Sequence, residues 1–181
     1  MGLDITYCSN IKNINVVLDE NDEDYDSKQD DAYDNSCFRA WNEYFPYQFG
    51  DLVHKAYYDG SDCGDLCAGS YSGYGSWRRQ LSNIVGYESI EYVWNDFNNQ
   101  IRKQKLYKLS DVEYKLSPFY ELLWFSDCEG TICSSVCKKL YKDFLEYDEK
   151  AIKEDKYFYK KYKEWTEAFR VASDNGAVSF H

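Results

Sequence analysis

The sequence predicts a single α+β domain, residues 1–181, in which a small N-terminal β-sheet or hairpin is covered by about four helices. Two observations support this. The chain has 181 residues, which is enough for one domain with a substantial core. Segments that alternate between apolar and polar residues come first, and segments with helical spacing follow. An order of strands and then helices is typical of α+β folds.

The first strands are predicted at the N-terminus. Leu3, Ile5 and Tyr7 alternate with polar residues, and a similar alternation returns over residues 14–18. This pattern predicts a β-hairpin or two neighbouring strands. Further along, glycines punctuate residues 60–69, a piece that can hold another strand but is not assigned by its pattern.

Helices are predicted where apolar residues recur every third or fourth position. The first begins at Tyr74 or Trp77 and ends at Val85, because Gly86 is a typical C-terminal stop. A short helix over residues 119–123 follows Pro118, which suits a first helical position. Three longer helices are predicted over residues 89–105, 127–147 and 155–173.

The net charge of −11 is concentrated in one segment. Nine carboxylates and one lysine lie between Asp19 and Asp34. We expect residues 19–36 to form a solvated, mobile loop within the domain. The alternative is a strip that mimics nucleic acid and docks on a basic partner. An acidic protein of this kind is not expected to bind duplex nucleic acid itself, because neutralising phosphates needs a basic face.

Seven cysteines form an odd set, and the N-terminus lacks the basic and apolar blocks of a signal peptide. These features predict a cytoplasmic protein with reduced, free thiols. No cofactor is expected. No apolar run reaches the roughly 18 residues that suggest a membrane span. The spacing of Cys63 and Cys67, and of Cys128, Cys133 and Cys137, departs from paired zinc knuckles. We therefore expect no metal site.

Residues 69–79 are the strongest candidate for a ligand site, because they combine small residues, aromatic rings and two adjacent guanidinium groups. A Gly- and Ser-rich loop that runs into a helix exposes backbone N–H groups that suit a phosphate. The residues expected to take part are Ser70, Ser72 and Gly73 for hydrogen bonds, Tyr71, Tyr74 and Trp77 for stacking, and Arg78 and Arg79 for phosphate. The alternative is a Ser-capped turn with Trp77 in the core and both arginines exposed.

Asp127 and Glu129 are candidates for hydrogen bonds to ribose hydroxyls. Ser126 followed by Glu129 also fits the capping box of a helix N-terminus, and both roles are compatible. An enzyme that degrades a nucleotide signal would use these carboxylates or a histidine. The sequence contains only His54 and His181 and no complete catalytic signature, so a binding protein is expected rather than an enzyme.

Several motifs spread over nearly the whole chain resemble a family of uncharacterised proteins from tailed bacteriophages and prophages. The matching segments are residues 1–5, Phe45-Pro46, residues 68–74 with Trp77-Arg78, residues 125–130 with Lys139-Leu140 and Asp143-Phe144, and residues 176–178 with Phe180-His181. The chain departs from the family at Cys133, where a small residue is usual, and in its extended acidic segment.

The resemblance implies a small phage accessory protein that acts in the cytoplasm of the bacterial host against a bacterial defence. Together with the loop over residues 69–79, it leads to the expectation of a non-catalytic protein that sequesters a nucleotide-derived immune signal. The alternatives are an acidic inhibitor that mimics nucleic acid and blocks a defence complex, such as a CRISPR effector, and an enzyme that degrades the signal.

Overall fold

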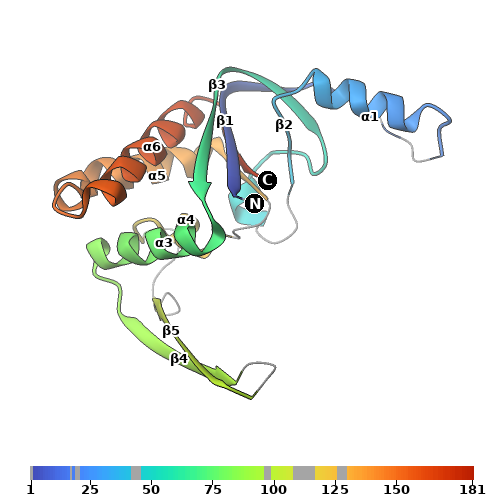
Figure 1. Cartoon of the computed structure of the whole chain (residues 1–181). Coiled ribbons are helices and arrows are strands. Elements are labelled where there is room, and N and C mark those ends of the chain that lie inside the picture. The colour runs from blue at the N-terminus through green and yellow to red at the C-terminus, as the bar shows by residue number, and fades with distance from the viewer. Residues whose placement is uncertain are drawn as a thin grey trace.

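The computed structural model in Figure 1 describes residues 2–16, 18, 21–41, 46–95, 99–107, 117–125 and 130–181. Within these residues the fold is α+β, as the sequence predicts. The elements in chain order are β1 (Leu3–Asn13), α1 (Tyr25–Asp34), β2 (Phe38–Arg39), α2 (Pro46–Phe49), β3 (Tyr57–Gly69), α3 (Tyr71–Val85), β4 (Ser89–Asn95), β5 (Ile101–Tyr107), α4 (Tyr120–Trp124), β6 (Gly130–Cys133), α5 (Ser134–Ala151), α6 (Lys156–Ala172) and β7 (Ala177–Phe180).

The central sheet has five antiparallel strands in the order β2-β3-β1-β7-β6. Strand β1 lies in the middle and pairs with β3 on one side and β7 on the other. The backbone groups of Asp4 and His181 exchange two hydrogen bonds, of 3.2 and 3.0 Å, so the two ends of the chain lie side by side. The sheet therefore depends on contacts between residues that are very distant in the sequence.

The N-terminal hairpin expected from the alternation is not formed. Strand β1 is one long strand whose neighbours, β3 and β7, come later in the chain. Residues 14–16 lie beyond its end, where the Ile14 amide donates to the Tyr57 carbonyl over 3.0 Å and Val16 is exposed. The unassigned glycine-punctuated piece belongs to β3, the longest strand.

Helices α3, α5 and α6 enclose the main core against the sheet. Helix α6 contacts β1, β3 and β7, and α5 packs against both α6 and α3. The core is strongly aromatic at its centre, where the ring of Trp165 stacks on Tyr74 and Trp77 with centroid distances of 5.7 and 5.5 Å. Phe180 of β7 closes the same group at 5.8 Å from Trp165.

Two of the predicted helices match closely. Helix α3 ends at Val85, and Gly86 follows it with a φ of 95°, the left-handed conformation that glycine adopts most easily. Helix α6 begins after Asp155, whose carboxylate accepts hydrogen bonds from the Tyr157 and Phe158 amides at 2.9 Å. The short helix expected over residues 119–123 is α4, which begins at Tyr120.

The helix predicted over residues 89–105 is wrong, because β4 and β5 form a separate two-stranded hairpin there. The helical spacing of Ile90, Val93 and Ile101 does not come from a buried face of a helix, because these residues are exposed. Their branching at Cβ favours strand conformation. The start of the helix predicted from residue 127 is also wrong, since residues 130–133 form β6 before α5 begins.

Residues 25–34 of the acidic segment form a helix, where a loop was expected. Helix α1 spans ten residues and projects away from the sheet in Figure 1. Asp26 in its first turn is well placed for the helix dipole, and Ala32 is the residue that it buries. Its carboxylates are exposed, so a short helix can carry them without desolvation.

A buried ionic cluster ties α4 to α5. The ammonium group of Lys139 lies 2.6 Å from a Glu121 carboxylate oxygen and 3.0 Å from one of Asp143, and it also donates to the Ser117 carbonyl. Asp143 accepts the Phe119 amide at 2.8 Å. Burial raises the pKa of both carboxyl groups, and the charge of Lys139 opposes that rise.

We predict that Lys139→Met destabilises the protein by about 3–5 kcal/mol, because two buried carboxylates lose their cation. The folded variant should then hold protons more tightly than the unfolded chain, so its stability should rise as the pH falls from 7 toward 5. Denaturant unfolding at several pH values measures both effects. Lys138→Met is the control, since Lys138 is exposed. Equal stability of the two variants at pH 7 would contradict the prediction.

We also predict that replacing residues 21–34 by a short Gly-Ser linker preserves the fold. Helix α1 buries only one residue, and the segment is otherwise solvated. Thermal unfolding of the shortened protein should stay cooperative, with a midpoint within a few degrees of the full-length value. A broad transition without cooperativity would show that α1 is part of the core.

Candidate functional site

The predicted loop over residues 69–79 is mostly the first part of α3. Ser70 is its N-cap, and the Ser70 hydroxyl accepts the Gly73 amide at 3.1 Å and contacts the Ser72 hydroxyl at 3.2 Å. The Tyr74 amide donates to the Ser70 carbonyl at 2.8 Å. These bonds occupy backbone N–H groups that were expected to bind a ligand. This arrangement agrees with the alternative, in which Ser70 caps the segment.

The two inner aromatic rings of this segment belong to the core. Tyr74 is fully buried and Trp77 is 4% exposed, and both stack on Trp165. A ring enclosed on its faces by other rings cannot also stack on a ligand's base, so the expected stacking role of Tyr74 and Trp77 is corrected. Tyr71 remains exposed at the start of α3.

Arg78 also has a structural position. One of its terminal nitrogens donates to the Phe125 carbonyl at 2.8 Å and to the Leu123 carbonyl at 3.4 Å, and its guanidinium carbon lies 4.6 Å from the Tyr74 ring centroid. Arg78 thus anchors the C-terminal end of α4 on α3. Arg79 is half-buried beside it. Asp127 and Glu129 lie outside the described residues.

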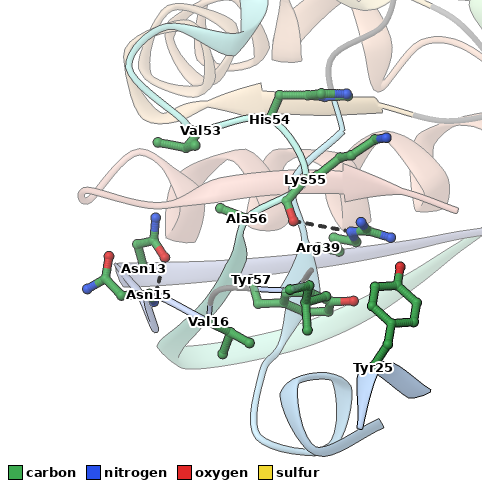
Figure 2. A pocket seen from close by; sticks show the side chains of 11 residues that line it. Asn13, Asn15, Val16, Tyr25, Arg39, Val53, His54, Lys55, Ala56 and Tyr57 are labelled. Carbon is green, nitrogen blue, oxygen red and sulfur yellow. Dashed lines mark hydrogen bonds between the residues drawn. The ribbon is translucent and has the colours of Figure 1, made fainter. Parts of the chain in front are cut away.

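A different pocket contains cationic and aromatic side chains of the kind that the sequence suggested for a site near Arg78 and Arg79. It has a volume of about 380 Å³ and lies where the ends of β1 and β2 meet the start of β3 and of α1. Figure 2 shows the side chains around it. The lining residues are Asn13, Asn15, Val16, Leu18, Tyr25, Arg39, Val53, His54, Lys55, Ala56 and Tyr57.

Two cations in this pocket lie on aromatic rings. The Arg39 guanidinium carbon is 5.3 Å from the Tyr57 centroid and 5.8 Å from that of Trp41, and the Lys55 ammonium is 5.5 Å from Trp41. The centroid of the His54 ring lies 4.9 Å from that of Trp41, and the two rings are tilted by 57°. Within the described ranges, neither Arg39 nor Lys55 pairs with a carboxylate.

Two residues that line the pocket have left-handed backbone conformations, which residues other than glycine adopt less often. Lys55 has a φ of 63° and Asn15 a φ of 52°. Lys55 is fixed there because its amide donates to the Ala40 carbonyl at 2.8 Å and its carbonyl accepts Arg39 Nε at 3.2 Å. The Asn15 amide donates to the Asn13 side chain at 2.7 Å. Such positions are common at binding sites, where the surrounding structure supports the strain.

Sequence reasoning missed this pocket because its members are separated by long stretches of chain. Asn13, Tyr25, Arg39 and Lys55 come from four segments. The local signal was the alternation of cationic and aromatic residues over residues 38–41, and no motif connects that piece to Lys55.

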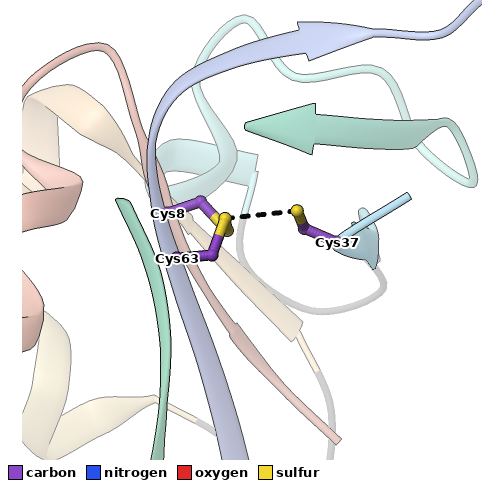
Figure 3. A group of neighbouring side chains, drawn as sticks. All are labelled: Cys8, Cys37 and Cys63. Atoms are coloured by element: carbon purple, nitrogen blue, oxygen red, sulfur yellow. Dashed lines mark hydrogen bonds between the residues drawn. A yellow bond between two sulfur atoms is a disulfide. The ribbon is translucent and has the colours of Figure 1, made fainter. Parts of the chain in front are cut away.

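The cysteines differ from the expectation of free thiols. Cys8 of β1 and Cys63 of β3 form a disulfide, while Cys37, Cys67, Cys133 and Cys137 are free. Figure 3 shows that Cys37 lies against the disulfide. In the part of the chain that the structure describes, Cys8, Cys37 and Cys63 are the one group whose sulfurs are close enough to hold a metal, within 4.8 Å of one another. With two of them joined, that group offers a single thiol.

Cys133 ends β6 and Cys137 lies in the first part of α5, and both are buried. Burial raises the pKa of the Cys137 thiol. A buried, protonated thiol packs as a small apolar side chain.

No family model, curated protein or solved structure matches this chain. Of the helices described, none combines the length and the apolar character needed to cross a membrane.

We predict that Arg78→Ala lowers the free energy of unfolding. Replacing an arginine that only binds a ligand would leave it nearly unchanged. Loss of charge-assisted hydrogen bonds to buried carbonyls should cost about 1.5–3 kcal/mol in unfolding free energy, measured by denaturant titration. Arg79→Ala is the matched control, because Arg79 forms no ion pair among the described residues, and it should change stability by less than about 0.5 kcal/mol. If both variants are as stable as wild type, Arg78 does not anchor α4.

Proposed function

We propose that the protein binds a small anionic ligand with an aromatic ring, of the nucleotide class, in the pocket around Arg39 and Lys55. The observation that carries this proposal is the position of two cations on aromatic rings, with no carboxylate partner among the described residues, in a protein of net charge −11. Two cations at one pocket, with no carboxylate partner among the described residues, suggest a place for a negative group.

The pocket offers complementary groups for each part of such a ligand. Arg39 and Lys55 suit phosphate oxygens, with the guanidinium able to bind two of them at once. The exposed side chains of His54 and Asn15 can donate hydrogen bonds, and Tyr25 adds a half-buried ring at the rim. A volume of about 380 Å³ is within the range of small-molecule sites.

The wider role that we propose is sequestration: a phage protein that holds a nucleotide-derived immune signal without turning it over. Two things support it, the resemblance to phage and prophage accessory proteins and the pocket chemistry. In this proposal the pocket, and not the segment over residues 69–79, binds the ligand. Sequestration requires only tight binding and no catalytic group.

We predict that ADP-ribose or a cyclic dinucleotide binds wild-type protein and that Lys55→Ala weakens binding roughly 10- to 150-fold, the loss of one charge-assisted hydrogen bond. Titration calorimetry measures the affinity. Trp41 emission provides a second signal, because both cations lie on that ring. Arg39→Lys should weaken binding less than Arg39→Ala, since it keeps the charge but loses the planar fork.

Lys153→Ala is the matched control, because Lys153 is an exposed lysine after α5 and far from the pocket in sequence. It should leave the affinity unchanged. Heating the complex and analysing the released molecule tests sequestration, since an intact ligand is expected and a cleaved one would indicate an enzyme. If neither compound binds wild-type protein, or if Lys55→Ala and Lys153→Ala bind equally well, the pocket is not the site.

A further inference from the structure

Three sulfur atoms from three separate segments of the chain lie close together. Cys8 of β1 is bonded to Cys63 of β3, and the sulfur of Cys37, just before β2, lies 3.2 Å from that of Cys63. Cys63 carries no proton while it is in the disulfide, so this is a contact between a free thiol and a disulfide. The Cys37 sulfur is also 3.5 Å from an Asp59 carboxylate oxygen, which can accept its proton.

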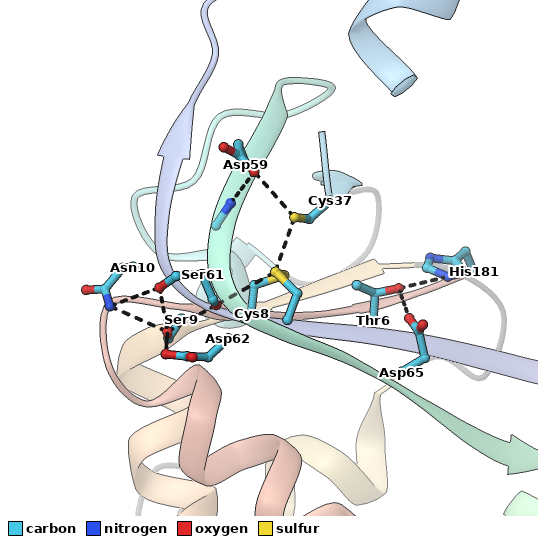
Figure 4. Close-up of a disulfide and its surroundings, with 12 residues drawn as sticks. Thr6, Cys8, Ser9, Asn10, Cys37, Asp59, Ser61, Asp62, Asp65 and His181 are labelled. Carbon is cyan, nitrogen blue, oxygen red and sulfur yellow. Dashed lines mark hydrogen bonds between the residues drawn. A yellow bond between two sulfur atoms is a disulfide. The ribbon is translucent and has the colours of Figure 1, made fainter. Parts of the chain in front are cut away.

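An irregularity in the sheet creates this meeting. The register between β1 and β3 shifts between Tyr7 and Ser9, and Asp62 at the shift has a φ of 47°. The Ser9 hydroxyl holds the bulged turn by donating to the Ser61 carbonyl at 3.1 Å (Figure 4). A bulge re-aims the side chains next to it, and here it leaves Cys63 facing both Cys8 and Cys37.

We propose that Cys8, Cys37 and Cys63 form an internal thiol–disulfide exchange site, in which Cys37 attacks Cys63 and Cys8 leaves. The Cys37 sulfur, after giving up its proton, forms a bond to the Cys63 sulfur. The bond between Cys63 and Cys8 breaks, and its electron pair goes to the Cys8 sulfur, which takes up a proton. One disulfide and one thiol are present before and after, so no oxidant or reductant is needed.

The geometry sets a condition on this step. All three sulfurs lie within 4.8 Å of one another, so Cys37 approaches the disulfide from its side. Attack on a disulfide proceeds along the S–S axis, and Cys37 must therefore rotate about its side-chain bonds before it reacts. It has room to do so, because Cys37 is half-buried and Cys63 is exposed, whereas Cys8 is fully buried.

The rate of exchange depends on how readily the Cys37 thiol loses its proton. Burial raises the pKa of this thiol, and the charge of Asp59 raises it further, while the Gly60 amide lowers it. Exchange requires the thiolate, so it should be slow near neutral pH and faster above it. The two forms differ in which thiol is free: the half-buried Cys37 in one, and the fully buried Cys8 in the other.

Exchange would also affect the binding pocket. This consequence rests on the proposed function. Cys37 stands two residues before Arg39, whose partner in β3 is Tyr57. A bond from Cys37 to Cys63 would link the start of β2 covalently to β3 and restrain the strand that carries Arg39. Which of the two disulfides is present would then tune the affinity of the pocket.

Peptide mapping tests the exchange without any ligand. Trypsin places Cys8, Cys37 and Cys63 on residues 1–12, 29–39 and 56–78, and the variant Cys67→Ser removes the second cysteine of the last peptide. Folded Cys67→Ser protein is incubated at pH 7 and at pH 9, trapped with a maleimide, and digested without reduction. We expect the Cys37–Cys63 link to appear beside the Cys8–Cys63 link, and to form faster at pH 9.

Two further variants make the result decisive. Cys37→Ser should keep only the link between Cys8 and Cys63. Cys8→Ser, oxidised with diamide, should form the link between Cys37 and Cys63, and near-UV circular dichroism checks that it is folded. If folded Cys67→Ser protein shows only the Cys8–Cys63 link at both pH values, with Cys37 fully labelled, or if the new link appears only in denaturant, the proposal is wrong. Neither result depends on whether nucleotides bind.

Discussion

The packing of aromatic rings around Trp165 is the interaction on which the rest of the structure depends. Trp165 of α6 stacks on Tyr74 and Trp77 of α3 and contacts Phe180 of β7, so one ring joins two helices to the sheet. Each such ring buries a large apolar area and also gains from its stacking geometry. This use of the rings decides what α3 can do: its inner face holds the fold, and Arg78 beside it holds α4. The inner face of α3 is therefore not open to a ligand.

The sequence predicted those parts of the fold in which a local signal matches the final packing. Asp155 caps α6 and Gly86 ends α3 by contacts within a few residues, and such contacts can be inferred from spacing alone. The α+β class followed from the order of patterns. The failures occur where distant pairing decides. Strands β6 and β7 are four residues each and exist because they extend the sheet beside β1, and four buried residues carry no readable period.

The candidate site could not be predicted for a related reason. Residues 69–79 looked like a ligand loop because glycine, serine, aromatic and arginine residues stand together in the sequence, but a capped helix start with an aromatic core face has the same composition. In the pocket, Arg39 meets Lys55 only because β2 pairs with the start of β3. That meeting depends on a backbone turn with Lys55 at positive φ, which lysine's own preferences do not signal.

The position of α1 bears on which anion the pocket can accept. Tyr25 at the start of this acidic helix lines the pocket together with Arg39 and Lys55, so the carboxylates of α1 belong to the surroundings of a ligand bound there. An extended polyanion such as duplex nucleic acid would bring many phosphates toward those carboxylates, and the repulsion would grow with each one. A compact ligand with one or two phosphates keeps its charge within contact distance of Arg39 and Lys55. Solvent ions screen carboxylates that are more than about 8 Å away at physiological salt. Under the proposed function, this charge distribution suits a small nucleotide better than a nucleic acid.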